Sequence, residues 1–145
     1  MKGNDYEAWI QYAHNDLSVA ISEMERAVNP RQRPYEVILY HCQQSAEKML
    51  KAYLIYNGIP VVFGSKSWGH DINALRTSCS SIDKGFAAAR IINHCSYLGL
   101  FSSVRYPDFS FSIDAAHARR AINSARRLFD FVSEKLGLCK LFSTL

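Results

Sequence analysis

The feature that most restricts the fold of this chain is an uncharged stretch within a helical pattern. No Asp, Glu, Lys or Arg occurs from Val37 to Ala46, and apolar residues recur there at the three- and four-residue spacing of a helix. A helix that lacks charge around most of its circumference needs neighbours on several sides. Pro34 suits the first position of such a helix, and Gly58 suits its end because glycine accepts a left-handed conformation. The sequence therefore predicts a central helix from Tyr35 up to Gly58.

Four other segments carry helical patterns of their own. No alternating strand pattern or hairpin signal accompanies them. We therefore expect an all-α fold, an up-and-down helical bundle of about five helices joined mostly by short links. The four segments run from Asp5 to about Val28, from Gly69 to about Cys79, from Ile82 to about Phe101, and from Ser112, as the N-cap, to Gly137.

The length and the apolar content indicate one compact unit. We expect a single domain over residues 1–145, with a core of about 5–137 and a short tail at 138–145. The hydrophobic fraction of 48% is enough for a buried core. No apolar run approaches the roughly 18 residues of a transmembrane helix, and residues 1–5 lack the apolar centre of a signal peptide. The expectation is a cytoplasmic protein without a membrane segment.

Cysteine spacing and motif content predict neither a metal nor a cofactor. The four cysteines form no C-x-x-C pair, and Cys42 and Cys95 occupy apolar helical positions typical of core side chains. There is no phosphate-binding loop, no G-x-G-x-x-G and no pair of carboxylates spaced for two metals. The formal charge of +4 is compatible with acidic partners such as nucleotides or RNA. The four cysteines are Cys42, Cys79, Cys95 and Cys139.

The charged residues of the central helix allow two interpretations. Glu47 and Lys51 are four residues apart, in the order that favours an ion pair along a helix. Alternatively, Lys48 and Lys51 contact phosphate, because an ammonium group is a good point charge for it. His41 lies in the uncharged part of the helix, where a hydrogen-bonded core or interface histidine is the preferred interpretation.

Outside the central helix, two pairs of residues are candidates for nucleic-acid chemistry. Arg105 stands beside Tyr106, and a guanidinium next to an aromatic ring suits phosphate and base recognition; an arginine that bonds helix carbonyls is the alternative. Arg90 and His94 are one turn apart on a predicted helix, where an acid or base beside a fixed positive charge suits RNA cleavage. We interpret the arginines of the last helix as a solvated face rather than an RNA surface. They are Arg119, Arg120, Arg126 and Arg127.

Several separate motifs occur in an order that is typical of one known family. They are Trp9–Ala13 followed by Asp16, then Cys42–Ala52, Gly69–Ile72 and Arg105–Asp108. Together they resemble the HEPN domains (higher eukaryotes and prokaryotes nucleotide-binding), and the resemblance covers roughly Tyr6 to Leu136. It implies an up-and-down helical bundle that is usually dimeric, which agrees with the fold expected from the helical patterns.

The resemblance also implies a function and a ligand site. Many prokaryotic HEPN proteins stand beside a small nucleotidyltransferase, so we expect a nucleotide- or RNA-associated binding module that works with such a partner, as in a toxin–antitoxin pair. The ligand residues that the resemblance implies are Lys48, Lys51, His70 and Arg105, with Tyr106 as a stacking surface. We expect them near one end of the central helix. On the residues alone, local capping at the start of the third helix is the preferred role of His70.

A metal-independent ribonuclease is the first alternative function. Ribonucleases of this family carry an arginine, four to six intervening residues and a histidine. None of the five histidines follows an arginine at that spacing, and the nearest approach is Arg90 and His94, with three residues between them. We therefore expect no ribonuclease activity and no enzymatic activity from this chain on its own. A purely structural interaction module is the second alternative.

A symmetric homodimer is the expected assembly. The first and fourth predicted helices carry aromatic residues beyond one buried stripe, namely Tyr12, Tyr97 and Phe101. Exposed aromatic residues favour association, and a two-fold dimer is the commonest closed assembly. The sequence therefore predicts that these three side chains lie at the surface of the protomer.

Overall fold

The computed structural model describes residues 5–59, 69–104, 106–109 and 112–138, so Arg105 and Cys139 lie outside the described residues. Over the described residues the chain is all helical, with five α-helices and no strand. This confirms the expected fold class. The elements are α1 (Tyr6–Glu25), η2 (Pro30–Gln32), α2 (Tyr35–Tyr56), α3 (Ile72–Ser80), η4 (Lys84–Ala87), α4 (Ala89–Gly99) and α5 (Ala115–Lys135), where η denotes a 3-10 helix.

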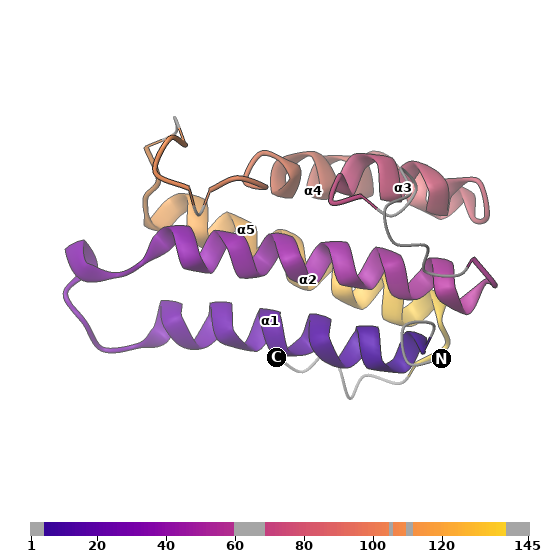
Figure 1. Cartoon of the computed structure of the whole chain (residues 1–145), viewed down its shortest axis with the longest axis horizontal. Helices are drawn as coiled ribbons and strands as arrows, with labels where there is room; N and C mark the ends of the chain where they lie inside the picture. The colour runs from indigo at the N-terminus through magenta and orange to yellow at the C-terminus, as the bar shows by residue number, and fades with distance from the viewer. Residues whose placement is uncertain (1–4, 60–68, 105, 110–111, 139–145) are drawn as a thin grey trace.

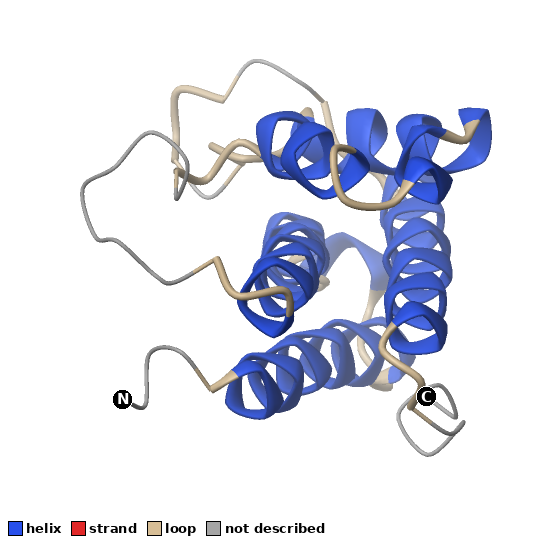
Figure 2. Ribbon diagram, turned by 90° about the vertical axis from the view of Figure 1, so that its right-hand side faces the viewer, coloured by secondary structure: helices blue, strands red, loops and turns tan. Residues whose placement is uncertain are grey.

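The helices form two layers. Figure 1 shows the three long helices α1, α2 and α5 along one axis, with α1 antiparallel to α2 and with α5 running in the same direction as α2. The shorter α3 and α4 lie side by side over α2 and α5. Figure 2 shows α1 at the bottom, the short helices at the top, and α5 rising beside them toward the short helices. Among the described residues, no helix has the length and apolar character that crossing a membrane requires.

Helix α2 is central, as its uncharged stretch predicts. It contacts α1, α3, α4 and α5, and Ile38, Leu39 and Cys42 have no exposed surface. The helix ends at Tyr56, and Gly58 follows it with a φ of 83°, the left-handed conformation expected of this glycine. Pro34 is the N-cap rather than the first helical residue. Burial on several sides is therefore the reason for the low charge of this segment.

The caps at the helix ends confirm some predictions and correct others. Asp5 and Asp71 cap α1 and α3 through their carboxylates, so the cap of α3 is Asp71 and not His70. Helix α1 ends at Glu25 rather than near Val28, because the backbone of Arg26 is extended. Ser112 is not the cap of α5. Asp114 takes that position and forms a capping box with His117, in which each side chain bonds the backbone of the other.

The predicted fourth helix is interrupted. The segment begins with the 3-10 helix η4, and α4 starts only at Ala89. Two features cause the break: the Asp83 carboxylate accepts a hydrogen bond from the Gly85 N–H, and Ala88 is extended with a ψ of 141°. The prediction of one continuous helix from Ile82 to Phe101 was therefore wrong. The break sets the start of α4, and with it the position of Arg90.

Two of the three aromatic residues expected at the surface are buried. Tyr97 is 7% exposed and Phe101 is 2% exposed, whereas Tyr12 is 63% exposed. The rings of Tyr97 and Phe101 pack edge to face with a centroid distance of 5.1 Å. The expectation that both lie on the protomer surface was wrong, because Tyr97 packs against α5, where its hydroxyl donates to the His117 carbonyl, and Phe101 packs against the rings of Tyr97 and His117. Cys42 and Cys95 are buried thiols, as predicted.

Candidate functional site

On one side of α2, a carboxylate of α1 binds a histidine and a lysine of α2. Asp16 lies 2.8 Å from His41 Nδ1 and also binds Lys48 Nζ. Burial opposes ionisation of Asp16, but the hydrogen bonds from His41 and Lys48 outweigh it and lower the pKa of this carboxyl. His41 is thus a hydrogen-bonded histidine between two helices, in agreement with the preferred interpretation of its sequence context.

A second carboxylate on α2 binds two further candidate residues. Glu47 is buried, and its two oxygens lie 3.1 Å from Lys51 Nζ and 3.0 Å from His70 Nδ1. Lys51 is buried as well, with its ammonium 5.7 Å from the centre of the Trp9 ring. The ion pair between Glu47 and Lys51 that the helical spacing predicts is confirmed. The ring of His70 is 80% exposed, and the cap of α3 is Asp71.

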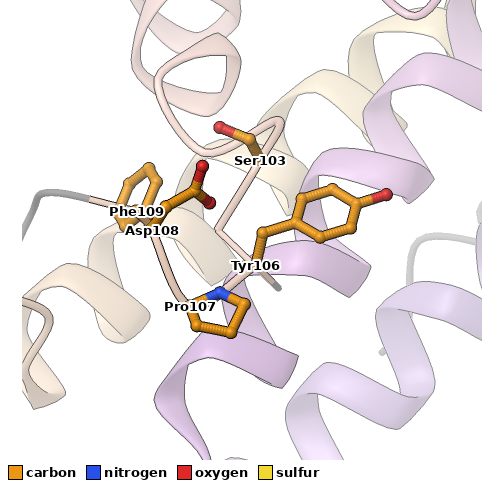
Figure 3. A pocket seen from close by; sticks show the side chains of 5 residues that line it. All are labelled: Ser103, Tyr106, Pro107, Asp108 and Phe109. Atoms are coloured by element: carbon orange, nitrogen blue, oxygen red, sulfur yellow. The ribbon is translucent and has the colours of Figure 1, made fainter.

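The predicted ligand residues are therefore divided among several local environments. Lys51 and His70 meet at Glu47, whereas Lys48 binds Asp16. Tyr106 is half exposed in the turn after α4, and its ring points away from Asp108 (Figure 3). This turn lines a shallow pocket of about 570 Å³. Arg105 is outside the described residues.

The facing sides of α4 and α5 carry a different kind of cluster. His94 of α4 hydrogen-bonds through Nδ1 to Ser124 of α5 at 3.0 Å. The Arg120 guanidinium lies 4.0 Å from the centre of the Tyr97 ring, and that of Arg90 lies 5.3 Å from the centre of the Phe131 ring. Aromatic faces thus support two of the guanidinium groups without neutralising them.

We call Arg90, His94, Arg120 and Arg127 the arginine face. Burial lowers the pKa of His94, and the positive charges of Arg127, Arg90 and Arg120 lower it further. His94 is therefore neutral near pH 7. Within the part of the chain that the structure describes, no carboxylate forms an ion pair with any of the three arginines. The arrangement concentrates positive charge around one neutral imidazole.

Sequence reasoning identified only half of this face. The spacing of Arg90 and His94 placed them on one side of a helix, and both lie on α4, where the charge of Arg90 contributes to the lowered pKa of His94. Arg120 and Arg127 are seven residues apart on α5, a spacing that puts them on one side of that helix. That spacing was a usable signal. The spacing does not show, however, that α4 is the helix that packs against this side of α5.

Comparison with known proteins places the chain in a family. The model of the HEPN domain matches residues 6–136. The crystal structure of TT1696 from Thermus thermophilus superposes with a TM-score of 0.72 at 23% identity, over 91% of this chain and 98% of that one. That of ST0689, an archaeal HEPN homologue, gives 0.65 at 26% identity, over 90% and 97%.

No curated protein shows significant similarity to the chain. The likeness to TT1696 is one of fold. The match to the domain model, by contrast, covers nearly the whole sequence, and the match to ST0689 agrees with it. The chain belongs to the HEPN domain family.

Proposed function

We propose that this protein is a binding module for RNA or nucleotide phosphates and that the arginine face makes the contacts. One observation carries the proposal: the positive charges of Arg127, Arg90 and Arg120 all contribute to the lowered pKa of His94, and no carboxylate among the described residues forms an ion pair with these arginines. Like charges repel each other, and a bound phosphate attracts each of the positively charged arginines. Arginine also matches phosphate geometry, because its planar group donates two parallel hydrogen bonds.

The lysines of α2 are the competing location for these contacts. Lys48, Lys51 and His70 were expected to form the ligand site with Arg105 and Tyr106. Each of the first three already binds a carboxylate, either Asp16 or Glu47. A phosphate at Lys48 or Lys51 has to displace that carboxylate or share the ammonium with it. At the arginine face, a phosphate displaces no carboxylate of the described residues. We therefore favour this face as the site of phosphate contact.

The test is fluorescence anisotropy with a labelled single-stranded oligoribonucleotide and with ATP. Arg90→Gln and Arg120→Gln should each weaken RNA binding about tenfold, the loss of one hydrogen bond to a charged group. The loss of affinity should shrink as salt rises, because the variant neutralises one phosphate fewer than the wild type and its binding therefore depends less on salt. Arg31→Gln in η2 removes the same charge from another part of the chain and serves as the control. Wild-type protein that binds neither ligand contradicts the proposal.

The same RNA samples test the absence of cleavage. The spacing between Arg90 and His94 is one residue shorter than in the ribonucleases of the family, so the RNA should stay intact in excess EDTA. Cleavage that disappears in His94→Ala would establish the ribonuclease alternative instead.

We further propose a homodimer and a nucleotidyltransferase partner. Two exposed apolar side chains of α1, Tyr12 and Val19, are seven residues apart and so share one side of that helix, which supports association through α1. Sedimentation that shows only a 16.5 kDa species at micromolar concentration would contradict the dimer. Membership of the HEPN family supports the nucleotidyltransferase partner, and co-purification with the product of an adjacent gene is its test.

A further inference from the structure

A separate pocket opens on the other side of α5, between this helix and the last turns of α1. Its volume is about 300 Å³. Helix α1 contributes Ile21, Met24 and Glu25 to the lining, and α5 contributes Ile122 and three polar residues. Ligand pockets of proteins begin at about this size, and an apolar lining with a few placed polar groups is typical of them. The volume suits a flat ring system rather than a whole nucleotide.

The polar residues of α5 share one side of the helix. Arg119, Asn123 and Arg126 are spaced by four and three residues, so successive turns bring them to the same groove. Arg119 and Asn123 are exposed and have no hydrogen-bond or ion-pair partner among the described residues. Both therefore have donor groups available to a ligand, and the asparagine also offers an acceptor.

Glu25 completes the pocket from the end of α1. Its carboxylate forms no ion pair within the described ranges. An ionised carboxylate only accepts hydrogen bonds and takes two parallel donors in a fork. Among the RNA bases, guanine presents two adjacent N–H donors, N1–H and the N2 amino group. Guanine also presents two acceptors, O6 and N7, which suit arginine or asparagine donors.

We propose that this pocket binds a guanine base of single-stranded RNA. The carboxylate of Glu25 accepts from N1–H and N2–H, while Asn123 and Arg119 donate to the acceptor edge of the base. Ile21, Met24 and Ile122 contact the base through their apolar surfaces. This inference rests on the proposed function and specifies its ligand. The strand crosses α5, with phosphates at the arginine face on one side of the helix and one base in the pocket on the other.

Single strands are the form of RNA that fits this arrangement. The Watson–Crick edge of guanine is free only in an unpaired base, and sequence-specific RNA recognition usually targets such splayed bases. The guanidinium of Arg119 adds a planar surface on which a base can stack. A duplex keeps N1–H and N2–H in base pairs and is therefore excluded from the pocket.

The experiment compares a labelled oligouridine with the same oligonucleotide carrying one central guanosine. Wild-type protein should bind the guanosine oligonucleotide about tenfold more tightly, the discrimination expected from one bidentate contact. Glu25→Gln should remove most of this preference, because glutamine lacks the second acceptor oxygen. Asn123→Ala should reduce the preference as well. Glu36→Gln, a charge change at the exposed start of α2, should have no effect.

The outcomes separate this inference from the proposed function. Equal affinity for the two oligonucleotides, a preference for adenosine or cytidine over guanosine, or an unchanged preference in Glu25→Gln overturns the guanine pocket. In each case, oligouridine binding that depends on Arg120 leaves the phosphate-binding function intact. If neither oligonucleotide binds the wild-type protein, both proposals fail. Circular dichroism of each variant confirms that it retains its helices.

Discussion

Two regions of this molecule hold positive charge in opposite ways. Along α2, each basic candidate residue binds a carboxylate: Lys48 and His41 bind Asp16, and Lys51 binds Glu47. On the arginine face, the guanidinium groups of Arg90 and Arg120 lie over aromatic rings, and no carboxylate in the described ranges binds them. The first region neutralises its charges within α2 or between α1 and α2. The second region keeps its charges available to solvent and to a ligand.

The difference shows that residue type alone does not identify a phosphate site. On the family motif alone, the ammonium groups of Lys48 and Lys51 are reasonable ligands for phosphate. In the structure, a carboxylate already binds each of them. A buried ion pair has to be complete, since one partner without the other leaves an uncompensated charge in the core. We therefore predict that substitutions along α2 mainly change stability, and that substitutions on the arginine face mainly change binding.

The largest effect is expected at Glu47. Glu47→Gln leaves the ammonium of Lys51 buried without a counter-charge, which should cost about 3–5 kcal/mol of unfolding free energy. Urea unfolding followed by circular dichroism measures it. The double variant Glu47→Leu with Lys51→Met removes both charges and should recover most of the loss. A single variant that unfolds like the wild type would show that the pair does not support the core.

A smaller effect is expected at Asp16, which is only partly buried. Asp16→Asn removes the partner of His41 and Lys48 and should cost about 1–3 kcal/mol. The native pKa of Asp16 is lowered, so its contribution is fully present above about pH 4, the ordinary value for the unfolded chain. It is lost as the pH falls through the lowered native pKa. Unfolding curves between neutral and acid pH should converge for wild type and Asp16→Asn.

Helix existence could be predicted from the sequence because periodicity and caps are local signals. The apolar stripe of α5 and the glycine after α2 are examples, and both are confirmed. The break before α4 was not predictable from the pattern. Asp83 caps the 3-10 helix at Gly85 and also binds Lys135 of α5 at 3.0 Å, and Ala88 is extended. Helical spacing shows neither the contact with α5 nor the extended backbone at Ala88.

The candidate site was less predictable than the fold, for the same reason. The pair of Glu47 and Lys51 is four residues apart and was foreseen. The pair of Asp16 and Lys48 is 32 residues apart and was not. Likewise, the contact between His94 and Ser124 needs the packing of α4 on α5. Sequence shows which residues share one side of a helix, but the opposing helix decides whether a charge is neutralised.

A modest pH effect on RNA binding should distinguish the two regions further. The pKa of His94 is lowered in the free protein, and a bound phosphate should raise it by favouring the charged imidazole. Affinity should therefore rise as the pH falls below about 6.5, by about tenfold at most for a pKa change of one unit. Anisotropy across this range measures the rise. His94→Gln should abolish it, whereas a rise that persists would assign the titration to another group.

The most direct test compares two substitutions that each remove one positive charge. Arg127→Gln alters the arginine face, and Lys48→Gln alters the ion pair with Asp16. We predict that Arg127→Gln weakens the binding of single-stranded RNA about tenfold and lowers the salt slope by about one. Lys48→Gln should leave the affinity within about twofold of wild type. Loss of binding in Lys48→Gln, with unchanged binding in Arg127→Gln and both proteins folded, would contradict the account.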